Sequence, residues 1–133
     1  MEYPDVEAYA EAWKRRLAEE EARGRELAAR AEETARRVAS TLVERYGAAE
    51  VWLFGSLARG RFRPGSDIDL AARRLPAREY FRILSEINAD QEFDLDLIDL
   101  DACPPWLAEA VRQQGRLLAR REPPEGEPRR EGP

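Results

Sequence analysis

The chain has 133 residues, 37% of them charged and 43% hydrophobic, so it is long enough for one domain with a core and carries a heavily charged surface. Its net charge of −5, from 22 basic and 27 acidic side chains, argues against a surface that coats nucleic acid in general. No segment reaches the roughly 20 apolar residues needed to cross a bilayer, and the N-terminus lacks a signal-peptide pattern, so we expect a cytoplasmic protein.

The chain contains no histidine and a single cysteine, Cys103. These counts exclude an internal disulfide, a Cys/His zinc site and histidine acid–base catalysis. Proton transfer therefore falls to carboxylates or to metal-bound water. We expect Cys103 to be a structural residue near a helix start.

The N-terminal third is predicted to form two helices. The first spans residues 5 to 23, and Gly24 is expected to end or break it; the second spans residues 25 to 46, with Gly47 as its C-cap. An apolar stripe follows one face of the first helix: Val6, Tyr9, Ala10, Trp13 and Leu17. This segment either packs on the sheet, or self-associates, or docks another protein through Trp13.

Residues 51 to 54 form an apolar run of strand length that stops at Gly55-Ser56. A second short strand, residues 67 to 71, carries Asp67 and Asp69 on one face, about 6.6 Å apart, because side chains alternate along a strand. Two like charges that close repel each other unless a cation lies between them. Since Mg²⁺ prefers carboxylate oxygens, we predict that both aspartates bind one or two Mg²⁺ ions carrying a nucleotide.

Gly55 and Ser56 supply the complementary half of this site. A residue without Cβ lets the backbone approach a phosphate, and the hydroxyl and N–H groups that follow can donate to its oxygens. A helix that begins at Leu57 would add its N-terminal dipole. Seven arginines against three acids between residues 57 and 82 suit a polyphosphate, or are ordinary solvated side chains: Arg59, Arg61, Arg63, Arg73, Arg74, Arg78 and Arg82.

Three further elements follow in chain order. A helix over residues 76 to 88 is expected to turn Phe81, Leu84, Ile87 and Tyr80 toward the core. A strand over residues 93 to 100 and a helix over residues 106 to 114 come next. Leu117-Leu118 forms a last short strand or a packed extension.

The order Phe54-Gly55-Ser56, ten residues, Asp67-Ile68-Asp69-Leu70 resembles the signature of the DNA polymerase beta-type nucleotidyltransferase superfamily. More narrowly, the run from Gly55 to Gly60 followed by Ser66 to Leu70 looks like the minimal nucleotidyltransferase (MNT) family. The resemblance covers roughly residues 48 to 118. It implies an α/β (α+β) fold of the polymerase beta type: a small mixed sheet flanked by helices, here with extra N-terminal helices.

The family expects a third carboxylate on a later strand, followed by two apolar residues. Asp96 fits this pattern, Asp94 on the same strand face is the reserve, and Asp99 has the opposite parity. The resemblance thus implies Asp67, Asp69 and Asp96 as catalytic and metal-binding residues. It implies nucleotide binding by Gly55, Ser56, Arg59 and Ser66.

The implied activity is Mg²⁺-dependent transfer of AMP from ATP to an acceptor hydroxyl. MNT proteins are commonly paired with a HEPN toxin and act as antitoxins that bind it or transfer AMP to it, typically onto a tyrosine. Two alternatives stay open: a non-catalytic antitoxin that neutralises by docking, and an antibiotic-type enzyme acting on a small molecule. The sequence leaves open the nucleotide preference, the acceptor and the oligomeric state, a homo-oligomer included.

The chain divides into three predicted segments. Residues 1 to 47 are the helical segment, and residues 48 to 120 are the nucleotidyltransferase core. Residues 121 to 133, rich in Pro, Glu and Arg, cannot bury an apolar face and are predicted to be a disordered tail.

Overall fold

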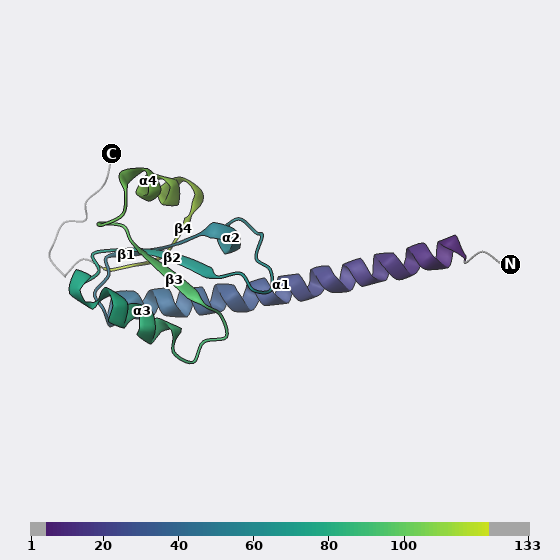
Figure 1. The fold of residues 1–133 in the computed structure, drawn as a ribbon, viewed down its shortest axis with the longest axis horizontal. Coiled ribbons are helices and arrows are strands. Elements are labelled where there is room, and N and C mark those ends of the chain that lie inside the picture. The colour runs from purple at the N-terminus through teal and green to yellow at the C-terminus, as the bar shows by residue number, and fades with distance from the viewer. Residues whose placement is uncertain (1–4, 123–133) are drawn as a thin grey trace.

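The computed structural model describes residues 5 to 122, which form one four-stranded mixed sheet with helices on both faces (Figure 1). The strand order is β3-β2-β1-β4; β1 is antiparallel to β2 and β4, whereas β2 and β3 are parallel. The elements are α1 (Val6–Glu44), β1 (Glu50–Phe54), α2 (Gly55–Ala58), β2 (Ile68–Arg73), the 3₁₀ turn η1 (Ala77–Glu79), α3 (Tyr80–Asn88), β3 (Leu95–Asp99), α4 (Pro105–Gln114) and β4 (Arg116–Arg120).

Val6–Glu44 form a single helix of 39 residues, α1, so the predicted break at Gly24 is wrong. A glycine inside a helix costs only about 1 kcal/mol, and the alanine, leucine, glutamate and arginine residues around it favour the helix enough to continue through it. Asp5 caps the start through its Oδ1, which accepts from Glu7 N at 3.0 Å. The helix ends just before Gly47, whose φ of +78° turns the chain and whose N–H donates to Val43 O.

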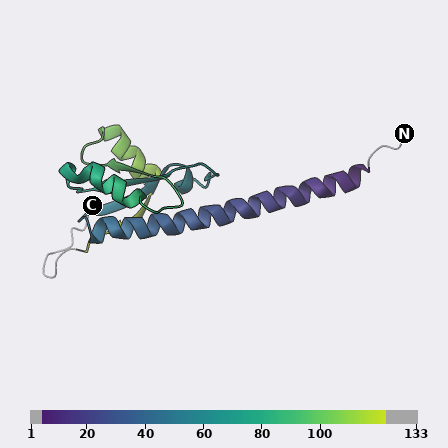
Figure 2. The same cartoon turned by 60° about the horizontal axis from the view of Figure 1, so that its bottom comes forward.

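Only the C-terminal half of α1 packs on the domain. Its buried residues are Ala31, Thr34, Ala35, Val38, Ala39 and Leu42. The N-terminal half projects away from the sheet, as both views show (Figures 1 and 2). The sequence left open whether this segment packs on the sheet, self-associates or docks another protein. Packing on the sheet applies only to the second half of α1.

The two faces of the sheet are covered by different helices. On one face, α1 and α3 bury the larger core, which includes Leu42, Leu53, Ile68, Leu70 and Ile83. On the other face, α4 places Val111 in a smaller cluster with Ala71 and Leu100, and Trp52, Phe54 and Ile98 pack around it. Because side chains alternate, Asp69 and Asp96 share the face of α4 with Ala71 and Ile98.

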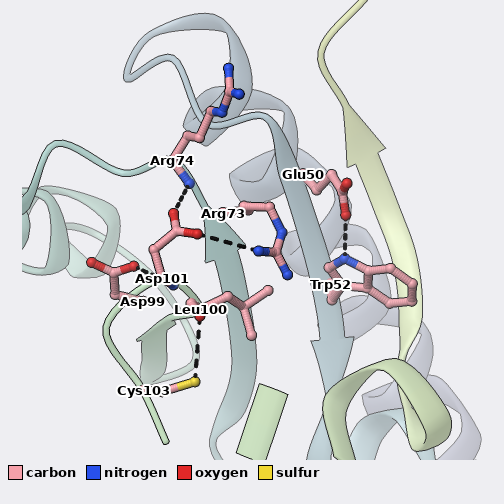
Figure 3. Close-up of polar contacts among 8 residues, drawn as sticks. All are labelled: Glu50, Trp52, Arg73, Arg74, Asp99, Leu100, Asp101 and Cys103. Carbon is pink, nitrogen blue, oxygen red and sulfur yellow. Dashed lines mark hydrogen bonds and ion pairs between the residues drawn. The ribbon is translucent and has the colours of Figure 1, made fainter. Parts of the chain in front are cut away.

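Asp101 joins the end of β2 to the segment that follows β3 (Figure 3). Its carboxylate accepts from Arg74 N at 2.6 Å and pairs with the Arg73 guanidinium at 3.3 Å. Nearby, the half-buried Cys103 donates its S–H to Leu100 O at 3.7 Å, two residues before α4. This contact agrees with the structural role expected for Cys103.

Several predicted boundaries and faces are refined. Phe81 is 81% exposed, so its predicted place in the core is wrong: the stripe of α3 runs through Tyr80, Ile83, Leu84 and Ile87, and Phe81 lies about 100° away from Tyr80 on the helix.

The predicted last strand is confirmed as β4. No helix among residues 5 to 122 is both long and apolar enough to span a membrane. Most of the predicted disordered tail, residues 123 to 133, lies outside the described residues.

The contact between α1 and β4 leads to a test of stability against pH. Arg116 donates to both carboxylate oxygens of Glu32, at 2.9 and 2.7 Å, and these bonds lower the pKa of Glu32 despite its partial burial. A carboxyl group whose pKa is lower in the folded than in the unfolded state stabilises the fold at pH values above its unfolded-state pKa. This stabilisation is lost as the pH falls through its folded-state pKa.

We therefore expect Glu32→Gln to reduce the free energy of unfolding by about 1 kcal/mol at pH 7, and by much less at pH 3. Urea denaturation at both pH values measures this difference. Glu109→Gln, which breaks an exposed pair with Arg112 within α4, is the matched control and should change little at either pH. An equal loss for Glu32→Gln at both pH values would contradict the assignment.

Candidate functional site

The backbone at Gly55 and the side chain of Asp69 lie against each other. Gly55 follows β1 with a φ of +75°, and a Cβ built on it would lie 2.1 Å from Asp69 Oδ2. No side chain fits in that space, so a glycine is required both by the backbone conformation and by the neighbouring carboxylate. The predicted Gly-Ser turn and the predicted carboxylate pair therefore lie against each other.

The strand register brings the carboxylates together at one end of strands β2 and β3. Phe54, the last residue of β1, is opposite Asp69, and Asp69 is opposite Asp96 on the parallel strand β3. Asp67 immediately precedes β2, where Ile68 N donates to Asp94 O at 2.9 Å. The three predicted acids thus come from the starts of two adjacent strands.

The electrostatics of Asp69 show how closely these groups lie. Burial, followed by the charges of Asp96 and Asp67, raises the pKa of Asp69 to about 6, while Arg59 acts in the opposite direction. Asp67 and Asp96 are exposed, whereas Asp69 is half-buried. Asp69 is therefore at the centre of an acidic cluster with one arginine beside it.

The structure distinguishes the three aspartates that the sequence offered near β3. Asp96 lies on β3, and its charge contributes to the raised pKa of Asp69. Asp94 lies just before the first residue of β3. Asp99 accepts from Asp101 N and, after burial and Asp96, contributes to the raised pKa of Tyr80. This arrangement favours Asp96 as the third carboxylate.

Tyr80 was expected only as a core residue of a helix. In the structure its hydroxyl donates to Leu97 O, and its pKa is raised by burial and by the charge of Asp96. Tyr80 thus packs against the larger core and also bonds to the backbone of β3 through its hydroxyl. Helical periodicity alone could not have indicated this second role.

The connector between α2 and β2 places the remaining predicted residues. Ser56 is half-buried in α2, and the Arg59 N–H at the end of that helix donates to Gly55 O. The hydroxyl oxygen of Ser66 accepts from Arg63 N at 3.1 Å, so this side chain stabilises the turn that precedes Asp67. Nucleotide binding by Ser56, Arg59 and Ser66 stays a prediction.

The chemistry of the donors fits Mg²⁺. Asp69, whose pKa is raised by burial and then by the charges of Asp96 and Asp67, forms with them the kind of oxygen set whose repulsion a divalent cation relieves. Within residues 5 to 122, no three acidic or cysteine side chains are already arranged as a metal site.

The family model for the polymerase beta nucleotidyltransferase domain matches residues 37 to 124 of the chain. Among curated proteins, none matches the chain significantly. The matched segment begins within α1 and contains the whole sheet, together with Gly55, Asp67, Asp69 and Asp96.

Solved structures with the same fold include three that are informative. A toxin–antitoxin structure with AMP-PNP is 25% identical, with a TM-score of 0.56 over 63% of this chain and 72% of that one. A candidate minimal nucleotidyltransferase is 27% identical, with a TM-score of 0.51 over 69% and 92% of the two chains. The complex of a tri-AMPylated Shewanella oneidensis HEPN toxin with its MNT antitoxin is 22% identical, with a TM-score of 0.53 over 67% and 71%, and this likeness shows the fold alone.

The close approach at Gly55 gives a test with a matched control. Gly55→Ala should force Asp69 out of place, whereas Gly60→Ala adds a Cβ at a similar φ of +71° with nothing within 4 Å of it. Gly60→Ala should lose about 1 to 2 kcal/mol of the free energy of unfolding, because alanine disfavours positive φ. Gly55→Ala should lose more, because it also displaces Asp69. Only Gly55→Ala should also lose affinity for ATP with Mg²⁺, by at least about thirtyfold in calorimetry. Equal affinities in the two variants would count against a site at this turn.

Proposed function

The chain belongs to the polymerase beta nucleotidyltransferase family, and we propose that it is a Mg²⁺-dependent enzyme that transfers AMP from ATP to a hydroxyl of a HEPN toxin, acting as its antitoxin. The observation that carries this proposal is the close packing of Gly55 against Asp69, with Asp96 opposite Asp69 on the neighbouring strand and Asp67 two residues before it on the same face. A glycine turn that faces three acids suits a triphosphate with its metal ions better than it suits a structural role.

In the proposed reaction each group has a defined part. The backbone at Gly55 and Ser56 holds the phosphates, and Arg59 offsets their negative charge. Asp67, Asp69 and Asp96 would hold one or two Mg²⁺ ions, which when bound neutralise the charge of the triphosphate. The carboxylate of Asp96 accepts the proton of the attacking hydroxyl.

Bond changes in this reaction balance without a further reactant. The acceptor oxygen forms a bond to the α-phosphorus of ATP, and the bond from that phosphorus to the bridging oxygen of pyrophosphate breaks. AMP stays on the acceptor, and pyrophosphate leaves. With no histidine in the chain, a carboxylate is the side chain best suited to take the proton at neutral pH.

The acceptor is proposed from the relatives. A toxin–antitoxin structure with AMP-PNP shares the fold at 25% identity, and a structural neighbour is the complex of an AMPylated HEPN toxin with its antitoxin. The acidic cluster is open to solvent at Asp67 and Asp96, which suits an acceptor group presented by another protein. Neutralisation by docking alone would not require the three carboxylates.

The test is incubation with labelled ATP and Mg²⁺, with and without a candidate HEPN protein, scored by mass spectrometry. We expect AMP on the partner with the wild-type protein and none with Asp67→Asn/Asp69→Asn, which should remain folded because the substitutions keep side-chain volume and remove repulsion. A tight complex without any transfer would overturn the catalytic proposal in favour of docking. AMP transfer to a small molecule only would overturn the proposed acceptor.

A matched pair of variants tests which residue is the third carboxylate. Asp96→Asn should lower the rate of AMP transfer by about a thousandfold or more, and Asp94→Asn by less than about tenfold. Both side chains are exposed and lie two residues apart, so neither substitution should unfold the protein. A difference between the two rates therefore reports on the role of each carboxylate. The reverse order of effects would assign the role to Asp94.

A further inference from the structure

Two side chains of α3 form hydrogen bonds with the outer edge of β3. Asn88, the last residue of α3, accepts from Leu95 N through its Oδ1 at 2.8 Å and donates through its Nδ2 to Leu95 O at 3.0 Å. The Tyr80 hydroxyl donates to Leu97 O. The residue between these two leucines is Asp96, so α3 holds the backbone on both sides of the predicted third carboxylate.

These bonds stand in for a neighbouring strand that β3 lacks. The strand order places β3 at an edge of the sheet, with β2 on one side only. In a parallel pair the backbone groups of alternate residues point toward the neighbouring strand. Asp94 and Leu100 bond to the backbone of β2, so the even-numbered residues between them, Asp96 included, face β2. Leu95 and Leu97 face outward, where a helix supplies the partners of their backbone groups.

The place of the Asp96 carboxylate depends on this backbone. Asp96 is exposed, and its carboxylate forms no hydrogen bond or ion pair with another residue between positions 5 and 122. An aspartate side chain has only two rotatable bonds, so the backbone largely determines where its carboxylate can lie. The connector before β3, residues 89 to 94, contains no helix or strand. Without the bonds from Asn88, the start of β3 would therefore be held by β2 alone.

We propose that Asn88 and Tyr80 are positioning residues that hold Asp96 opposite Asp69 for the transfer of AMP, an inference that rests on the proposed function. Neither side chain has to touch ATP or the acceptor. Because a displacement of a reacting group by about 1 Å can cost a hundredfold in rate, loss of either side chain should slow the chemical step. The binding of ATP at the glycine turn should not change.

The chain offers a matched pair of tyrosines for the test. The hydroxyl of Tyr46 also bonds to α3, but its partner is the exposed side chain of Glu86 rather than the backbone of β3. Both tyrosine rings pack against the larger core. Tyr80→Phe and Tyr46→Phe therefore each remove one hydroxyl and keep the ring, and only Tyr80→Phe releases β3.

Steady-state AMP transfer to the candidate HEPN protein measures the effect. Tyr80→Phe should lower kcat by about tenfold and Asn88→Ala by about thirtyfold, with the KM for ATP within about twofold of the wild-type value. Tyr46→Phe should leave both constants unchanged, and circular dichroism should show all three variants folded. A wild type that transfers no AMP would overturn the proposed function. An active wild type whose Tyr80→Phe and Asn88→Ala variants are equally active would overturn this inference alone.

A double-mutant cycle shows whether Asn88 acts through Asp96. Calorimetry with Mn²⁺ alone supplies a readout that needs no AMP transfer. Asn88→Ala should raise the Kd for Mn²⁺ about fivefold in the wild-type background and leave it unchanged in the Asp96→Asn background, where the positioned carboxylate is gone. An equal rise in both backgrounds would indicate a general loosening of the fold and would contradict a positioning role.

Discussion

The site depends on the absence of a side chain at one position. Gly55 ends β1 in a left-handed conformation, and the Asp69 carboxylate occupies the space where its Cβ would be. This contact fixes the distance between the glycine turn and the acidic cluster. Every other group of the site is placed relative to these two: Phe54 and Asp96 by strand register, and Arg59 by the short helix that begins at Gly55.

The sheet separates two tasks by its faces. One face carries the extensive apolar packing of α1 and α3, which stabilises the domain. The other face is covered by α4 only in part, so charged side chains at the starts of β2 and β3 stay near solvent. Asp69 is half-buried because its side chain points to the face that α4 covers only in part, whereas its neighbours Ile68 and Leu70 point into the larger core.

The sequence predicted the family, the mixed sheet and the residues that come together at the glycine turn. The family and the mixed sheet are confirmed, and strand parity correctly predicted which side chains share a face, as the pairing of Asp69 with Asp96 shows. The catalytic and binding roles of these residues stay predictions. The break at Gly24 was wrong because the propensity of one residue is weaker than that of the helix formers around it. Phe81 and the outer stripe of α1 were ambiguous because periodicity reveals an apolar face without revealing what covers it.

The pairing of β4 with β1 has a consequence for how the protein is made. Arg120 pairs with Glu50, so the sheet is completed only when the last described strand has been synthesised, whereas β1, β2 and β3 can associate earlier. Until then the buried stripe of α1 has an incomplete surface to pack against. On a ribosome, α1 would therefore gain its full packing surface, including the contact of Glu32 with Arg116, only after β4 has emerged.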